Sequence, residues 1–167
     1  LYGHRLRAAL PKSELPKHVG VILDGNRRWA ANQGSDTAHG HRVGGEKIAE
    51  FLGWCEELGI EVVTLWLLST DNLARDEREL STLFCIIEET IQDLANTKRW
   101  RINPVGALHF LPESMPGALK NVQNQTANVS GILVNVAIGY GGRQEVVDAV
   151  KSLLREHATA GSSLEEL

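Results

Sequence analysis

The chain has 167 residues, of which 43% are hydrophobic and 23% are charged, as is typical of one globular domain with a buried core. Its net charge of −4 argues against a general nucleic-acid-binding protein, because such proteins usually carry a basic face. No apolar run approaches the ~20 residues that are needed to cross a bilayer.

The first predicted strand is the apolar run at residues 19–23, which ends directly in the cluster Asp24-Gly25-Asn26-Arg27-Arg28. A helix is expected to start near Asn26 and to run past Trp29, and residues 31–40 are expected to form a polar loop. Gly44-Gly45 should then open a second helix, because apolar residues recur after it every three or four positions.

The middle of the chain contains a near-continuous apolar run at residues 62–68, which predicts a strand buried on both faces. The polar cluster Ser69-Thr70-Asp71-Asn72 follows it, and a long helix is expected over about 76–95. The apolar stripe of that helix is more typical of a core than of a ligand pocket. The two cysteines, Cys55 and Cys85, are expected to be buried thiols, which favours a reducing, cytoplasmic location.

The last part of the chain predicts a weaker strand near 101–106, a short helix near 116–127 and a clear strand at 131–138. Tyr140-Gly141-Gly142-Arg143 and a helix to about residue 156 follow. This alternation predicts an α/β fold with a mainly parallel central sheet flanked by helices. We expect one catalytic domain over residues 1–167.

Polar clusters follow the three clear strands, and they begin at Asp24, Ser69 and Gly139. Ligands of parallel α/β sheets bind outside the carboxyl ends of the strands, so the three clusters are expected to face the same edge. This convergence predicts a binding site more strongly than any one cluster does.

The first cluster suits a phosphate group. Gly25 would let a ligand approach the backbone, the amides that open the next helix would point at an anion, and arginine can hold phosphate oxygens with paired hydrogen bonds. Asp24 would repel a phosphate unless a magnesium ion lies between them. The alternative is an Asp-Gly turn that caps a helix beside solvated arginines.

Other candidates have equally ordinary alternatives. His41 lies among glycines that suggest a second anion-binding helix start, but it could also be a surface loop histidine. Ser69 and Asn72 could be helix caps. Arg75 could be a solvated ion-pair partner of Asp76 or Glu79.

Residues 18–30, HVGVILDGNRRWA, resemble the first signature of the cis-prenyltransferases, the undecaprenyl diphosphate synthase family. Gly40-His41, the stretch STDNLAR at 69–75 and Tyr140-Gly141-Gly142-Arg143 match later motifs of that family in the same order. The resemblance covers about residues 16–156. It implies the cis-prenyltransferase fold and a transferase that elongates an allylic diphosphate with isopentenyl diphosphate, forming a Z double bond.

The resemblance also implies roles for individual residues. Asp24 would hold Mg2+ on the allylic diphosphate, and Asn72 matches the position often assigned as proton acceptor, although a neutral amide is a weak base. A relay through Ser69, or the released diphosphate, is chemically more credible. Trp29 would wall the nearby pocket. The remaining implied substrate-binding residues are Gly25, Asn26, Arg27, Arg28, His41, Ser69, Thr70, Asp71 and Arg75.

This sequence departs from the family pattern at Arg27, Thr37 and Leu73, where many members carry glycine, arginine and tryptophan. The Arg-x-Ser-Gly type motif and the glutamate that supply the isopentenyl diphosphate site and a second metal ligand are not among the 167 residues. We therefore expect the chain to lack a C-terminal portion of its domain. The resemblance further suggests a homodimer, with peripheral membrane association and no nucleic-acid partner.

Leu67 is a candidate for control of product length. Long-chain members of the family commonly carry a small alanine two residues before the serine, so the larger leucine predicts a short product of about fifteen carbons, Z,E-farnesyl diphosphate from a geranyl starter. The alternative for Leu67 is that it simply packs against a helix. The alternatives for the whole protein are a synthase of long undecaprenyl or decaprenyl chains, a non-catalytic subunit of the same family, and a generic phosphate-ester enzyme. Strict alternation along this strand puts Thr64, Trp66 and Leu68 on one face and Val63, Leu65 and Leu67 on the other.

Overall fold

The computed structural model describes residues 15–160. Four parallel strands form one sheet in the order β1-β2-β4-β3. Their bounds are β1 (His18–Ile22), β2 (Val62–Ser69), β3 (Arg101–Val105) and β4 (Leu133–Tyr140). The predicted α/β fold with a parallel sheet is therefore confirmed.

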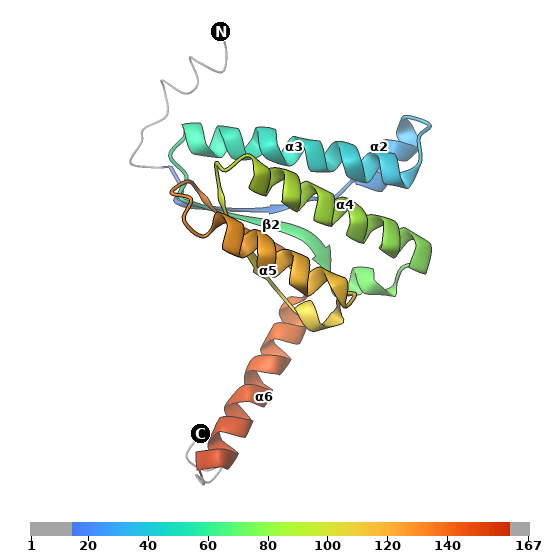
Figure 1. Cartoon of the computed structure of the whole chain (residues 1–167). Coiled ribbons are helices and arrows are strands. Elements are labelled where there is room, and N and C mark those ends of the chain that lie inside the picture. Colours follow the sequence, from blue (N-terminus) through green and yellow to red (C-terminus); the bar gives the residue numbers. More distant parts are fainter. Residues whose placement is uncertain (1–14, 161–167) are drawn as a thin grey trace.

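The helices of the described residues connect these strands. They are α2 (Asn26–Asn32), α3 (Thr37–Glu57), α4 (Glu77–Asn96), α5 (Ser114–Thr126) and α6 (Gly142–Ala160), with short 3-10 helices η2 (Asp71–Ala74) and η3 (Leu108–Phe110). In Figure 1, α3, α4 and α5 form a layer in front of the sheet, whereas α6 extends away from the other elements. Every helix within residues 15–160 is too short or too polar to cross a bilayer.

The core lies between the sheet and the layer of α3, α4 and α5. The central strands supply its most buried side chains, because β2 and β4 each have a neighbouring strand on both sides. These side chains are at most 1% exposed, and they are Val63, Leu65, Leu68, Val134, Val136 and Ile138. The core thus fixes the carboxyl ends of β2 and β4 relative to α4.

A bulge in β2 changes which residues face the core. Trp66 pairs with Ala137, but Leu68 pairs with Ile138, so Leu67 is an extra residue in β2. The predicted strict alternation is therefore wrong at this end of the strand. Leu68 is 1% exposed and joins Val63 and Leu65 in the core, while Leu67 is only partly buried.

The start of α3 also differs from the prediction. The helix begins at Thr37 rather than at Gly44-Gly45, because the Asp36 side chain accepts a hydrogen bond from the His39 N–H at 2.7 Å and caps it. A β-carbon on Gly40 would meet the carbonyl oxygen of Asn26 at 2.4 Å, and one on Gly44 would meet Asn26 Oδ1 at 2.6 Å. These glycines therefore allow close packing of α3 on α2, and they do not open a second anion-binding helix.

Gly40→Ala is expected to destabilise the protein by about 1–3 kcal/mol, because the added methyl group overpacks the contact with backbone atoms of α2. Gly53→Ala in the same helix is the matched control, since its methyl group would be 3.8 Å from Arg99 Nη2, an ordinary contact. The control should stabilise the helix by roughly 0.5–1 kcal/mol. Chemical denaturation measures both changes, and equal effects of the two substitutions would contradict the packing role of Gly40.

The two cysteines differ in exposure. Cys55 on α3 is buried, as predicted, and this burial raises the pKa of its thiol. Cys85 on α4 is exposed, so the prediction of a buried thiol is wrong there. The buried side of α4 instead contains its neighbours Leu83, Ile86 and Ile87, and Cys85 lies off that stripe.

Candidate active site

The ends of β1 and β2 meet α3 and α4 around a cavity of about 460 Å³, a size common for small-molecule sites. One part of its wall is polar and is formed by Asp24, Gly25, Asn26, Arg27, Arg28, His41, Ser69, Asn72 and Arg75. The other part is apolar and includes Leu23, Ile48, Leu67, Leu68, Leu83, Ile86 and Ile87. The cavity therefore suits a ligand with an anionic head and a hydrocarbon tail.

Asp24 follows the end of β1, and Gly25 turns the chain into α2 with a positive φ of 97°. Asp24 Oδ1 accepts a hydrogen bond from the Gly25 N–H at 2.6 Å, and Oδ2 lies 3.2 Å from Arg28 Nη2. The Asp24 and Arg28 side chains are 77% and 79% exposed. The predicted Asp-Gly turn is thus formed, and Asp24 and Arg28 pair with each other in the wall of the cavity.

Arg75 and Arg27 share one carboxylate. Arg75 Nη1 lies 3.1 Å from Glu79 Oε1, and Arg27 Nη1 lies 3.8 Å from the same oxygen. The ion pair between Arg75 and Glu79 that the sequence suggested is formed, and Arg75 also lines the cavity. The ion-pair prediction is therefore confirmed, and the substrate-binding role of Arg75 stays a prediction.

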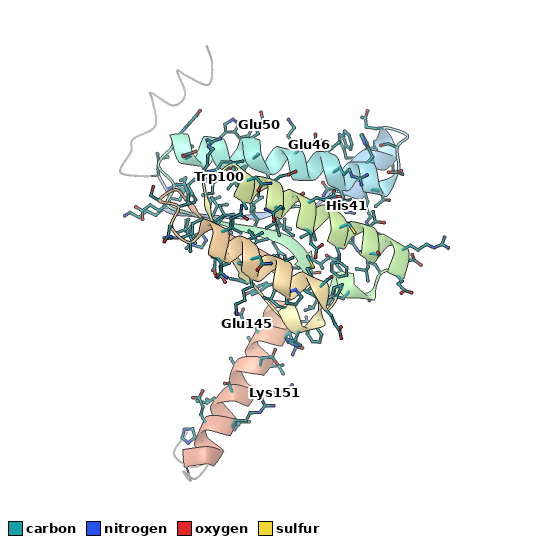
Figure 2. The ribbon with its side chains drawn as sticks, in the orientation of Figure 1. His41, Glu46, Glu50, Trp100, Glu145 and Lys151 are labelled. Carbon is teal, nitrogen blue, oxygen red and sulfur yellow. The ribbon has the colours of Figure 1, made fainter. Side chains whose placement is uncertain are left out.

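His41 lies on α3 beside α4 (Figure 2), so the alternative of a surface loop histidine is wrong. Its Nε2 atom is buried and has no hydrogen-bond partner within residues 15–160. Burial lowers the pKa of His41, the nearby charges of Arg75 and Arg27 lower it further, and Glu79 acts in the opposite direction. In a neutral imidazole one ring nitrogen is a donor and the other is an acceptor. His41 lines the cavity, so a ligand bound there could provide the hydrogen-bond partner that Nε2 lacks.

Ser69 and Asn72 hold each other in place. The Ser69 N–H donates to Asn72 Oδ1, and the Asn72 N–H donates to Ser69 Oγ, both at 3.2 Å. Thr70 is the N-cap residue of η2 and makes no side-chain capping hydrogen bond, so the interpretation of Ser69 and Asn72 as helix caps is wrong, but both residues line the cavity. Because Oδ1 accepts a backbone hydrogen bond, the Asn72 side chain has its NH₂ group left to donate to a ligand.

Three predicted site residues do not line this cavity. Trp29 is 41% exposed and stacks on His39 with 5.9 Å between the ring centroids. Thr70 and Asp71 follow the end of β2, where Asp71 begins η2, and neither is among the lining residues. The structure therefore brings nine of the predicted residues together around the cavity, and it places Trp29 against His39 of α3 instead.

The third polar cluster lies at the predicted edge but beside a different hollow. Tyr140 and Gly141 line a space of about 310 Å³ together with residues that follow β3. The Tyr140 hydroxyl donates a hydrogen bond to Glu145 on α6, which raises the pKa of Tyr140. The three clusters therefore share one edge of the sheet, as predicted, but they line two different hollows, because β4 lies between β2 and β3 and the residues after it line the hollow beside β3.

Sequence reasoning missed the part that α4 plays in the cavity. Four residues of α4 line the cavity, although the apolar stripe of this helix was interpreted as more typical of a core than of a ligand pocket: Leu83, Ile86, Ile87 and Thr90. Leu83 and Ile87 contribute to both. Thr90 was the available signal, because this polar residue continues the stripe of Leu83 and Ile87 and lies opposite Gly45.

The residues present suit a magnesium ion that is shared with a ligand. Asp24 is the carboxylate of the cavity wall, and no group of three or more His, Cys, Asp and Glu side chains that could hold a metal occurs within residues 15–160. Magnesium commonly binds through one or two carboxylates together with substrate phosphates. Asp24 and a bound diphosphate would therefore supply the ligands jointly.

A protein-family model described as "Putative undecaprenyl diphosphate synthase" matches residues 22–166, a range that includes every residue of the cavity wall. The chain belongs to this cis-prenyltransferase family. Its cavity is thus a site within the matched part of a cis-prenyltransferase.

Two curated cis-prenyltransferase relatives are similar over nearly the whole chain. The (2Z,6E)-farnesyl diphosphate synthase of Thermobifida fusca is 57% identical over 98% of this chain and 64% of its own length. Isoprenyl transferase 1 of Streptomyces avermitilis is 54% identical over 99% of this chain and 65% of its own length. The chain therefore spans less than two thirds of the length of either relative.

A solved structure confirms the cis-prenyltransferase fold. Lavandulyl diphosphate synthase from Lavandula x intermedia, crystallised with dimethylallyl diphosphate, matches with a TM-score of 0.83. The match covers 90% of this chain and 66% of the other chain at 24% sequence identity. At this identity the likeness concerns the fold alone.

Proposed function

We propose that the full-length protein condenses an allylic diphosphate with isopentenyl diphosphate and forms a short Z-configured prenyl diphosphate. The observation that supports this most is the division of one cavity into an arginine-rich wall and an apolar wall. Such a cavity matches an allylic diphosphate, which has a charged head and a hydrocarbon tail. The name of the Thermobifida fusca relative, at 57% identity, supports a farnesyl product of about fifteen carbons.

In this proposal, Arg27, Arg28 and Arg75 bind the diphosphate, since guanidinium groups pair with phosphate oxygens in a fixed geometry. His41 Nε2, which has no partner within residues 15–160, donates a further hydrogen bond. A magnesium ion bound by Asp24 and the phosphate oxygens would stabilise the charge that develops as the diphosphate leaves. The protein thereby orients C1 of the allylic substrate for attack.

The chemical step breaks the bond between C1 and the diphosphate oxygen. The double-bond electrons of isopentenyl diphosphate form the new bond between its C4 and C1 of the allylic substrate, which leaves a cation at C3. A proton then leaves C2, and the electrons of that C–H bond form the new Z double bond between C2 and C3. Asn72 is a weak candidate for the base, because its amide is neutral and its Oδ1 already accepts the Ser69 N–H. We propose that the released diphosphate accepts the proton, and that Asn72 donates a hydrogen bond that positions this diphosphate.

The second substrate needs residues beyond those that line the cavity. The relatives are longer than this chain, and the family motif for isopentenyl diphosphate is not among its 167 residues. We propose that residues 1–167 belong to one catalytic domain that a further C-terminal segment completes. The proposal also includes a homodimer and a geranyl starter. We place the enzyme in the cytoplasm, in peripheral contact with the membrane, because its substrates are charged and its product chain is apolar.

The proposal is tested by incubating the full-length protein with labelled isopentenyl diphosphate and, separately, dimethylallyl, geranyl or farnesyl diphosphate. Label should enter an organic-extractable product only when an allylic starter and Mg2+ are both present. Hydrolysis of the starter without incorporation would instead indicate a phosphate-ester enzyme, and no reaction of either kind would indicate a non-catalytic subunit.

Arg28→Lys should weaken binding of the allylic diphosphate by roughly tenfold, because lysine keeps the charge but loses the paired hydrogen-bond geometry. Arg99→Lys is the matched control, since Arg99 is also an exposed arginine in an ion pair, with Glu56 at 2.5 Å, and does not line the cavity. The KM for geranyl diphosphate measures the effect. Equal KM values for the two variants would remove Arg28 from the binding site.

A further inference from the structure

Glu79 is a carboxylate that contacts two of the three arginines of the cavity, although it does not line the cavity itself. Its Oε1 atom lies 3.1 Å from Arg75 Nη1 and 3.8 Å from Arg27 Nη1. The Arg75 and Glu79 side chains are only 20% and 26% exposed, in contrast to the Asp24–Arg28 pair at the same site. Because solvent screens the Arg75–Glu79 pair less than the Asp24–Arg28 pair, the attraction between Arg75 and Glu79 restricts their side chains more.

The backbone around Glu79 is fixed. Asp76 caps α4, and its Oδ1 atom accepts hydrogen bonds from the Arg78 and Glu79 N–H groups at 2.9 and 3.4 Å. Arg75 directly precedes this cap, whereas Arg27 belongs to α2. One carboxylate at the start of a long helix thus reaches cations from two separate segments of the chain.

An arginine can bind a carboxylate and an anionic ligand at the same time. Its guanidinium carries five N–H donors, so the contact of one Nη1 with Glu79 leaves other donors for a phosphate. Without a partner, the long arginine side chain adopts many rotamers, and a ligand must then select one of them. Because Glu79 does not line the cavity, it can hold the guanidinium groups without meeting the ligand's own negative charge.

We infer that Glu79 is a positioning residue that holds Arg75 and Arg27 ready for the diphosphate head of the substrate. The inference rests on the proposed function, because it concerns the same cavity. It assigns to Glu79 an effect on substrate binding that acts entirely through the two arginines.

The sign of the effect separates positioning from simple electrostatics. Removing the negative charge of Glu79 makes the cavity more positive, so charge alone predicts tighter binding of an anion by Glu79→Gln. Loss of positioning predicts weaker binding. Glu79→Asp keeps the charge but shortens the side chain, so it too should weaken binding if the position of the carboxylate matters.

The test measures binding of inorganic diphosphate to the full-length protein by titration calorimetry, together with the KM for geranyl diphosphate. Glu79→Gln should raise both the dissociation constant of diphosphate and the KM by about tenfold, and Glu79→Asp should raise them by a smaller factor. Glu77→Gln is the matched control, because Glu77 is an exposed acid in the same first turn of α4, and it should leave both values unchanged. In a background that carries both Arg27→Ala and Arg75→Ala, most of the effect of Glu79→Gln should disappear, since Glu79 acts through these two arginines.

The possible outcomes are distinct. Wild-type binding or tighter binding by both Glu79 variants, with active wild-type enzyme, overturns the role of Glu79 and leaves the proposed function intact. An undiminished effect of Glu79→Gln in the background that carries both Arg27→Ala and Arg75→Ala also overturns it, because Glu79 would then act independently of both arginines. A wild-type protein that binds no diphosphate and forms no product overturns the proposed function and the role of Glu79 together. If Glu79→Gln unfolds, as shown by its thermal midpoint, Glu79→Asp decides by the same criteria.

Discussion

Asp24→Ala is expected to lower the turnover of the full-length enzyme by roughly a thousandfold or more, equivalent to about 4 kcal/mol of transition-state stabilisation. The reason is that Asp24 is the carboxylate of the cavity wall and lies among its arginines. Without it, an ion that offsets the charge of the leaving diphosphate has no protein ligand there. Steady-state turnover with geranyl and isopentenyl diphosphates measures the loss.

Asp24→Asn provides the control for structure. The asparagine side chain can still accept the hydrogen bond that the Gly25 N–H donates to Oδ1, but it carries no charge. Both variants should keep the thermal midpoint within a few degrees of the wild type, because the Asp24 side chain is 77% exposed. Near-normal turnover of the asparagine variant would exclude Asp24 as a metal ligand.

Leu67→Ala is expected to shift the product to longer chains. Leu67 lines the cavity and is partly buried against the core, so we propose that its side chain limits the space available to a growing prenyl chain. The bulge in β2 turns Leu68, not Leu67, into the core with Val63 and Leu65. Removal of the leucine side chain therefore opens the cavity wall, and the main product should lengthen by at least one isoprene unit.

Leu58→Ala is the matched control for this change. Leu58 is also partly buried against the core, but it follows the end of α3 and does not line the cavity. Both substitutions should cost stability, by about 2–3 kcal/mol, but only Leu67→Ala should alter the product profile seen by chromatography. Unchanged products from Leu67→Ala would show that another residue limits chain length.

The sequence was sufficient to predict the strands and the principal polar residues of the site. Apolar runs at residues 62–68 and 131–138 indicated buried parallel strands, and the rule for strand ends brought Asp24 and Ser69 to one cavity. The same rule did not separate the two hollows at that edge. Which strand ends share a cavity depends on the order of the strands in space, and that order places Tyr140 beside β3.

Other features depend on contacts that a pattern along the chain does not contain. The glycines at 40 and 44 are required by the approach of α2, and the bulge at Leu67 is defined by its pairing with β4. Ile86 and Thr90 face the cavity, but the period of an apolar helix is the same whether a core or a ligand covers it. Three-dimensional packing decides each of these cases.

The most direct test of the account is the structure of the product that the full-length enzyme makes from geranyl diphosphate and isopentenyl diphosphate. Nuclear magnetic resonance of the product gives the configuration of the new double bond, and mass spectrometry gives the chain length. The account predicts a Z double bond, and it predicts a main product of about fifteen carbons from the proposed role of Leu67 in the cavity wall. An E double bond would contradict the assignment to Z-prenyl transfer, and a main product of about fifty carbons would contradict the role of Leu67.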